Sequence, residues 1–137
     1  MYEVFEHTAD LGLRVRAETL DALFAEAARG FFSLILSNLH AVQCVQRKSY
    51  ELASEGLDYL LFDWLNELLY TLDAERLVLA EFHVHVASGR SLSADCRGEP
   101  LDAERHGVCR EIKAITYHGL QVAREGEGWV AEVILDV

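Results

Sequence analysis

The sequence predicts an α+β fold in which two main helices pack with mostly antiparallel sheet. Two long stretches with helical spacing of apolar residues stand among several short stretches in which apolar and polar residues alternate. Short turns join them, and no Gly/Ser-rich or Pro-rich linker divides the 137 residues. We therefore expect a single domain over residues 1–137, with the number of sheets and the strand order left open.

The first clear strand pattern covers residues 11–17. Its apolar positions alternate with polar residues or glycine, which is typical of a strand with one face in water, and they are Leu11, Leu13, Val15 and Ala17. Apolar residues also occupy much of 2–5. The polar segment EHTAD, residues 6–10, thus precedes the strand at its entrance.

Candidate N-cap residues and apolar residues at helical spacing predict two helices. Thr19 is a candidate N-cap for a helix that ends near Ser37, because apolar residues recur at helical spacing between them. Ser54 is the candidate cap of the second helix, whose leucines and Trp64 between residues 57 and 72 form a broad apolar stripe. We expect that stripe in the core and the acidic residues of the helix on its outer side.

The remaining segments predict further strands. Residues 42–53 suit an exposed strand, while 79–87 and 92–96 suit two neighbouring strands joined by a turn. Residues 98–107 predict a loop. The final stretch, 111–137, predicts a unit that turns over residues 126–128 and ends inside a sheet.

The excess of acidic residues limits the classes of partner that the protein could bind. The chain carries 23 acidic against 12 basic residues, a formal net charge of -11, which repels a nucleic-acid backbone and attracts cations or a basic protein. No secretory signal or membrane-spanning apolar run is visible, so a cytoplasmic protein without membrane contact is expected. The cysteines, Cys44, Cys96 and Cys109, are widely spaced, and we expect reduced, buried thiols.

Two aspartates are the leading candidates for a binding site. Asp10 ends a polar patch between apolar segments, and Asp136 stands in the apolar stretch VILDV although Asp is a poor strand former. Val137 adds a terminal carboxylate beside Asp136. If these groups met, like charges about 4 Å apart would repel by about 4 kcal/mol at an effective dielectric of 20, and a hard cation would remove that cost. The alternative is a capping Asp10 and a solvated Asp136.

Other polar residues have weaker claims. His7 could orient a ligand, carry a proton, or be a structural histidine. Lys113 could hold an anion, pair with Asp10, or form an ordinary surface ion pair. His83 and His85 lie on one side of a predicted strand and could chelate a metal, or simply face solvent.

Common catalytic signatures are missing. The sequence contains no GxxxxGK[ST], GxSxG or HExxH motif, and no nucleophile with an adjacent base stands out. We therefore expect a protein that is not an enzyme.

Three stretches together resemble the archease family: YEVFEHTADLGL, LLFDWLNELLY, and EIKAITYHGLQV leading into VILDV. The resemblance implies an accessory protein for an RtcB-type tRNA-splicing RNA ligase. Such a protein promotes the GTP-dependent guanylylation of a ligase histidine and allows multiple turnover in tRNA splicing and RNA repair. The metal-binding positions of the family match Asp10, Asp136 and Val137, which implies a divalent cation, Ca²⁺ first and Mg²⁺ or Mn²⁺ as alternatives.

Two other functions remain open from the residues. A free-standing, metal-dependent phosphoesterase would use Asp10 and Asp136 to hold the ion and His7 as base. A chaperone-like module for RNA-modifying enzymes would depend instead on the acidic face of the second helix.

Overall fold

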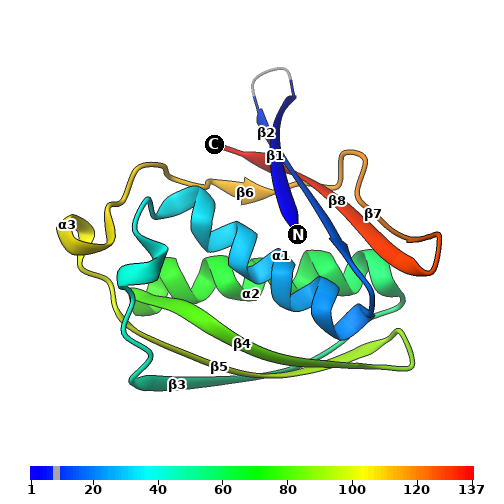
Figure 1. Cartoon of the computed structure of the whole chain (residues 1–137), viewed down its shortest axis with the longest axis horizontal. Helices are drawn as coiled ribbons and strands as arrows, with labels where there is room; N and C mark the ends of the chain where they lie inside the picture. The colour runs from blue at the N-terminus through cyan, green and yellow to red at the C-terminus, as the bar shows by residue number, and fades with distance from the viewer. Residues whose placement is uncertain (8–9) are drawn as a thin grey trace.

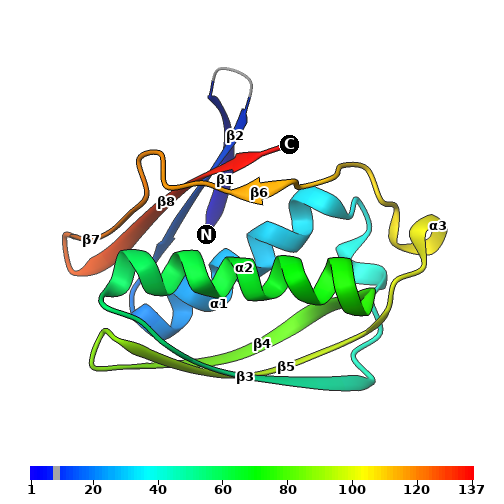
Figure 2. The ribbon, with the colours of Figure 1, turned by 180° about the vertical axis from the view of Figure 1, so that it is seen from behind.

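The computed structural model describes residues 1–7 and 10–137, with only the backbone of His7. Two antiparallel sheets enclose a layer formed by the two long helices, with the five-stranded sheet on one side and the three-stranded sheet on the other (Figure 1). The same three layers are visible from behind, where the longest helix crosses in front (Figure 2). This arrangement confirms the predicted α+β class with mostly antiparallel sheet.

The larger sheet joins the two ends of the chain. Its strand order is β1-β2-β8-β6, and β7 also pairs with β8. The strands are β1 (Tyr2–His7), β2 (Asp10–Ala17), β6 (Ala114–Ile115), β7 (Gln121–Glu125) and β8 (Gly128–Asp136). Strand β8 thus lies between β2 and β6, so the last hairpin does end inside a sheet.

The smaller sheet is formed by the middle of the chain. Its order is β3-β5-β4, with β3 spanning Gln46–Ala53, β4 Leu77–Ala87 and β5 Ser91–Pro100. The residues that alternate inward along these strands, such as Phe82 and Ala94, are buried against the helices. Those that alternate outward form a polar face.

The helices are α1 (Leu20–Ile35) and α2 (Leu57–Glu75), with a 3₁₀ turn η1 at Leu39–Ala41 and a short helix α3 at Ala103–His106. Thr19 caps α1 as predicted, since its Oγ1 accepts a hydrogen bond of 3.1 Å from the Ala22 N–H. Trp64 of α2 is fully buried and donates its indole N–H to the Phe24 carbonyl at 3.0 Å. The two helices are thereby fixed to each other inside the core.

Three local predictions were wrong. Gly56, not Ser54, is the N-cap of α2, and the Ser54 hydroxyl donates to Asp63 at 3.0 Å. Strand β3 begins at Gln46 rather than 42, since η1 occupies the chain just before it. Strand β5 continues to Pro100, into the predicted loop, where Gly98 allows the close approach of the Val78 backbone.

The cysteines also differ from expectation. Cys96 is fully buried, and burial raises the pKa of its thiol to about 12. Cys44 and Cys109 are free but exposed, so the prediction of buried thiols was wrong for these two. Within residues 1–7 and 10–137, no helix is both long and apolar enough to cross a membrane.

Candidate functional site

Asp10 and Asp136 are brought level in the larger sheet. Asp10 is the first residue of β2 and Asp136 the last of β8. The antiparallel register pairs Leu11 with Leu135, so the next step along each strand places the two aspartates opposite each other. Residues from the two ends of the chain therefore meet at one end of the sheet.

Both aspartates lie on the outer face of that sheet. Leu13 and Leu135 are fully buried against the helices, so side chains of the opposite parity project outward. The outward ion pair between Arg14 and Glu132 confirms this parity across the same two strands. Asp10 and Asp136, which we call the aspartate row, are each partly exposed, so solvent or a partner can reach them.

A small apolar patch adjoins the two acids. Phe5 of β1 pairs with Gly12, and its ring covers that residue so closely that an added Cβ would lie 2.1 Å from the ring. Ile134 pairs with Gly12 from the other side and is only 5% exposed. An apolar surface formed by Phe5 and Ile134 thus lies next to the two aspartates on the outer face of the sheet.

The other predicted site residues lie beside this row. Ala114 pairs with Asp136, and the backbone N–H of Lys113 donates to the Asp136 carbonyl at 2.8 Å. The backbone of His7 pairs with Asp10, but the predicted role of the His7 side chain lies outside the described residues. Val137 follows Asp136, the last residue of β8, and the C terminus lies near the β1–β2 hairpin in both views (Figures 1 and 2).

The predicted ion pair between Lys113 and Asp10 is absent from the part of the chain that the structure describes. The Lys113 residue is exposed, so its ammonium group faces solvent. Its contribution to the row is the backbone hydrogen bond to Asp136, which ties β6 to the end of β8.

The donor set fits a hard cation. Asp10 and Asp136 offer carboxylate oxygens, which Ca²⁺ and Mg²⁺ prefer. Among the described residues, no three His, Cys, Asp or Glu side chains are grouped to hold a metal. A cation between the two aspartates would therefore need further oxygens from Val137, the backbone or water.

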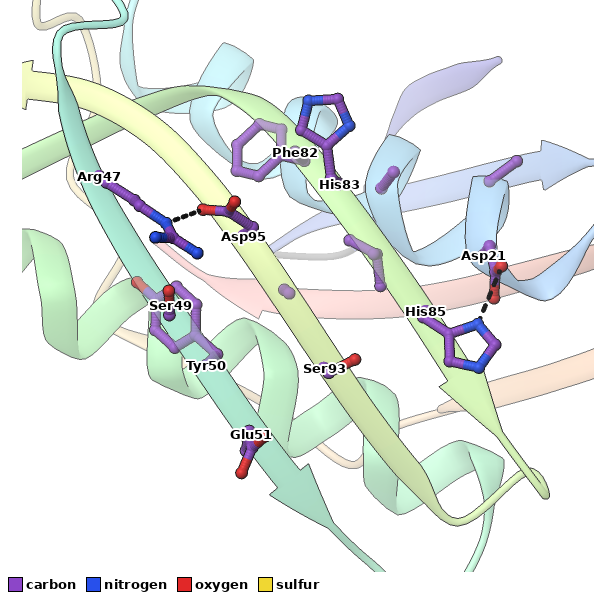
Figure 3. Close-up of a pocket in the computed structure, with 14 residues that line it drawn as sticks. Asp21, Arg47, Ser49, Tyr50, Glu51, Phe82, His83, His85, Ser93 and Asp95 are labelled. Carbon is purple, nitrogen blue, oxygen red and sulfur yellow. Dashed lines mark hydrogen bonds and ion pairs between the residues drawn. The ribbon is translucent and has the colours of Figure 1, made fainter.

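A hollow of about 600 Å³ lies elsewhere, on the outer face of the smaller sheet (Figure 3). His83 and His85 both project from this face, as predicted. His85 Nδ1 is 3.4 Å from Asp21, while His83 Nε2 is 3.2 Å from Glu81. Among the described residues, no third His, Cys, Asp or Glu is grouped with the two histidines to hold a metal ion.

Four polar side chains of this hollow pair with each other, Arg47 with Asp95 and Asp21 with His85. Arg47 donates to Asp95 at 2.7 Å and holds the pKa of that carboxyl below its usual value. Asp21 accepts the backbone N–H of Val86 at 2.8 Å, which fixes the edge strand β4 to α1. We therefore assign these contacts a structural role.

A buried ionic cluster is the main feature that sequence patterns did not reveal. Arg105 donates to both oxygens of Glu99, at 2.7 and 2.8 Å, and Gln43 adds its backbone N–H at 2.6 Å. His106 is fully buried and accepts the Asp102 N–H at Nδ1, so its Nε2 carries the proton and donates to Glu99 at 2.9 Å. These donors, Arg105 first, hold the pKa of Glu99 far below its usual value.

This Glu99 cluster ties β5, α3 and the segment after η1 together. Its only sequence signal is a dense set of charged residues between 99 and 106, which also suits a solvated loop. We assign it a structural role.

The whole chain matches one known family. Residues 2–137 match the model of the Archease protein family (MTH1598/TM1083). The chain belongs to the archease family. Protein archease of Methanopyrus kandleri is 37% identical, with 99% of each chain covered. Protein archease of Pyrococcus abyssi is 36% identical over 99% of this chain and 98% of its own.

Solved structures agree with the archease assignment. The solution structure of Methanobacterium thermoautotrophicum protein 1598 has a TM-score of 0.85 and 30% identity, covering 99% of this chain and 98% of the other. The crystal structure of a Thermotoga maritima archease, described as a possible chaperone, has a TM-score of 0.66 at 19% identity, covering 100% and 98%. The second likeness supports the fold alone. The resemblance inferred from the three sequence stretches is confirmed, while the cation at Asp10 and Asp136 stays a prediction.

Proposed function

We propose that this archease chain is an accessory protein that activates an RtcB-type RNA ligase. It promotes the GTP-dependent guanylylation of the ligase and allows multiple turnover in tRNA splicing and RNA repair, in the cytoplasm. The observation that carries the proposal is the row formed by Asp10 and Asp136, which the register brings together from opposite ends of the chain. Family membership supports the same function.

The proposed site holds a divalent cation through Asp10, Asp136 and the Val137 carboxylate. Ca²⁺ is the first candidate, and Mg²⁺ or Mn²⁺ are the alternatives. When bound, the ion supplies positive charge that compensates the clustered carboxylates. Strand pairing on both sides of β8 holds Asp136 in place, and the Lys113 N–H adds one further hydrogen bond.

The position of the row suits presentation to a partner protein. It lies at one end of the larger sheet, on its outer face, where no helix covers it (Figure 1). Asp10 and Asp136 belong to regular strands, so their backbone is held before any partner arrives. His7 pairs with Asp10 through its backbone and is a second-rank contributor.

The charge of the chain fits this role. A net charge of -11 disfavours direct binding of RNA, so the RNA would be held by the ligase. The same charge attracts the basic surface that a protein needs to bind RNA. The chemistry belongs to the ligase, and this chain acts as an activator rather than an enzyme.

Ligase assays test the proposal directly. Guanylylation with labelled GTP and multiple-turnover RNA joining are measured with ligase alone and with wild-type protein, Asp10→Ala or Asp136→Ala. Wild type should stimulate both steps, and each variant should lose most of the stimulation. Glu127→Gln, in the turn at the other end of β8, is the matched control and should stimulate like wild type. Equal stimulation by all four proteins would contradict the site.

A chaperone role is the second candidate, because the Thermotoga maritima archease is described as a possible chaperone. Such a module would protect RNA-modifying enzymes from aggregation and would not need Asp10. Light scattering of a heated client enzyme separates the two functions. Protection by Asp10→Ala equal to that by wild type, without ligase stimulation by either, would favour the chaperone.

A further inference from the structure

An aromatic hollow lies on the surface where α2 begins. It has a volume of about 460 Å³ and is lined by Asp58, Tyr59, Tyr117 and Leu120, which we call the tyrosine pocket. Tyr59 is 51% exposed and Tyr117 is 58% exposed, although both are large rings. Asp58 and Tyr59 come from the first turn of α2, and the other two come from the connection between β6 and β7.

The rings of the pocket are already ordered. Tyr117 stacks on Phe62, with ring centroids 4.0 Å apart and an interplanar angle of 13°. Tyr59 meets Tyr117 at 6.1 Å and 66°, an edge-on geometry. Phe62 is partly buried and packs against the core, so this stack anchors the pocket wall. A ligand would therefore meet a prepared aromatic surface.

The carboxylate of the pocket is also fixed. Asp58 Oδ1 accepts the backbone N–H of Val122 at 2.7 Å, which joins α2 to the start of β7. Within residues 1–7 and 10–137, no Lys, Arg or His forms an ion pair with Asp58. Its negative charge is therefore held beside the two tyrosine rings without a compensating cation from the described chain.

We propose that the tyrosine pocket receives an arginine side chain from a basic protein partner. A guanidinium group is planar and weakly hydrated, so it stacks on tyrosine rings while its N–H groups donate to a carboxylate. The net charge of -11 draws a basic protein surface toward the chain. A phosphate ligand would be repelled by Asp58, and an uncharged apolar group would bury that carboxylate unpaired.

This surface is distinct from the aspartate row. Tyr117 follows β6, whose Ala114 pairs with Asp136, but its ring stacks on Phe62 of α2. Both aspartates lie instead on the outer face of the larger sheet, away from the helices. The pocket can be tested alone, because its ligand is a single side chain.

The first test titrates the protein with Nα-acetyl-arginine methylamide and follows the Tyr59 and Tyr117 ring signals by NMR. The citrulline analogue, which has the same shape without the charge, is the matched probe. The arginine compound should shift these signals with saturation, and the citrulline compound should not. Equal shifts with both probes, or shifts confined to other residues, would overturn the proposal.

Substitutions in the tyrosine pocket then test which side chains contact the arginine. Asp58→Asn keeps an oxygen for the Val122 N–H but removes the charge, and Tyr117→Leu keeps apolar cover over Phe62 but removes the ring. Each should weaken arginine binding by about threefold or more, the size of an exposed cation–π contact. Tyr70→Leu, an exposed tyrosine of the same helix outside the pocket, is the control and should bind like wild type. Unchanged binding by both pocket variants would contradict the assignment.

These variants leave Asp10 and Asp136 intact. Loss of arginine binding and loss of ligase stimulation are therefore separate results, and either proposal can fail without the other.

Discussion

Asp10 and Asp136 lie opposite each other on adjacent antiparallel strands, although they stand near opposite ends of the sequence. Adjacent strands are about 4.8 Å apart, so their carboxylates share one patch of the outer face. Two like charges there oppose folding unless a cation or a partner compensates them. The cation proposed for this site would offset that repulsion.

Neutralising one member of the row should have opposite effects with and without calcium. In excess chelator, Asp10→Asn should raise the free energy of unfolding by about 0.5–1 kcal/mol, the size of an exposed charge interaction, because the repulsion is removed. Calcium at about 100 times its dissociation constant should add about 2.7 kcal/mol to wild type and much less to the variant. Thermal unfolding under both conditions measures this. An equal gain in both proteins would contradict calcium binding at Asp10.

Extending the chain past Val137 should impair ligase activation. A short C-terminal Gly-Ser extension moves the α-carboxylate away from Asp136 and replaces it with a neutral amide. Stimulation of ligase guanylylation should then fall by about tenfold or more if that carboxylate is a ligand. The matched control carries the same extension at the N terminus. Full stimulation by the C-terminally extended protein would remove Val137 from the site.

The Glu99 cluster should make stability depend on acid pH. Arg105, the Gln43 N–H and His106 stabilise the ionised carboxylate, so the pKa of Glu99 is lowered in the folded state from its ordinary value of 4.5. A group with a depressed pKa stabilises the fold above its unfolded pKa, and this stabilisation is lost as the pH falls below about 4.5.

Glu99→Gln tests that dependence. The variant should be less stable than wild type at pH 7, and the difference should shrink as the pH falls below 4.5. Urea unfolding at several pH values measures it. Asp73→Asn, an exposed acid of α2, is the control. A stability difference that is constant from pH 7 to pH 3 would contradict the cluster.

Gly98 should tolerate no side chain. A Cβ at this position would lie 1.8 Å from the Val78 carbonyl oxygen, which belongs to the backbone of the paired strand β4. Gly98→Ala should therefore destabilise the protein by about 2 kcal/mol or more, because strand backbone must move. Ser93→Ala, on the exposed face of the same strand, should change stability little. Chemical denaturation of both variants provides the measurement, and equal stabilities would contradict the close approach at Gly98.

Local sequence signals predicted the elements that local interactions determine. Thr19 supplies a side-chain cap to α1, and the alternation at residues 11–17 reports a sheet with one buried face. Ser54 has the residue type of a cap, but α2 begins only at Leu57, after Gly56, and the Ser54 hydroxyl donates to Asp63. Residue type alone therefore did not locate the start of this helix.

Features that depend on contacts between distant parts of the sequence were harder to predict. The unusual Asp in VILDV marked Asp136 as a candidate, and the family resemblance paired it with Asp10, but only strand pairing shows the two side by side. Glu99 and His106 sit in a segment whose charges suit a solvated loop equally well. Tyr59 and Tyr117 belong to separate elements, so their shared pocket has no period or motif in the sequence.

Calcium titration calorimetry tests the central claim most directly. Metal-free wild type, Asp10→Asn, Asp136→Asn and the control Glu127→Gln are titrated with Ca²⁺ under one set of conditions. Wild type and Glu127→Gln should bind one ion per chain, and each aspartate variant should bind at least about tenfold more weakly. The same affinity in all four proteins, or no binding by wild type to Ca²⁺, Mg²⁺ or Mn²⁺, would contradict a cation site at Asp10 and Asp136.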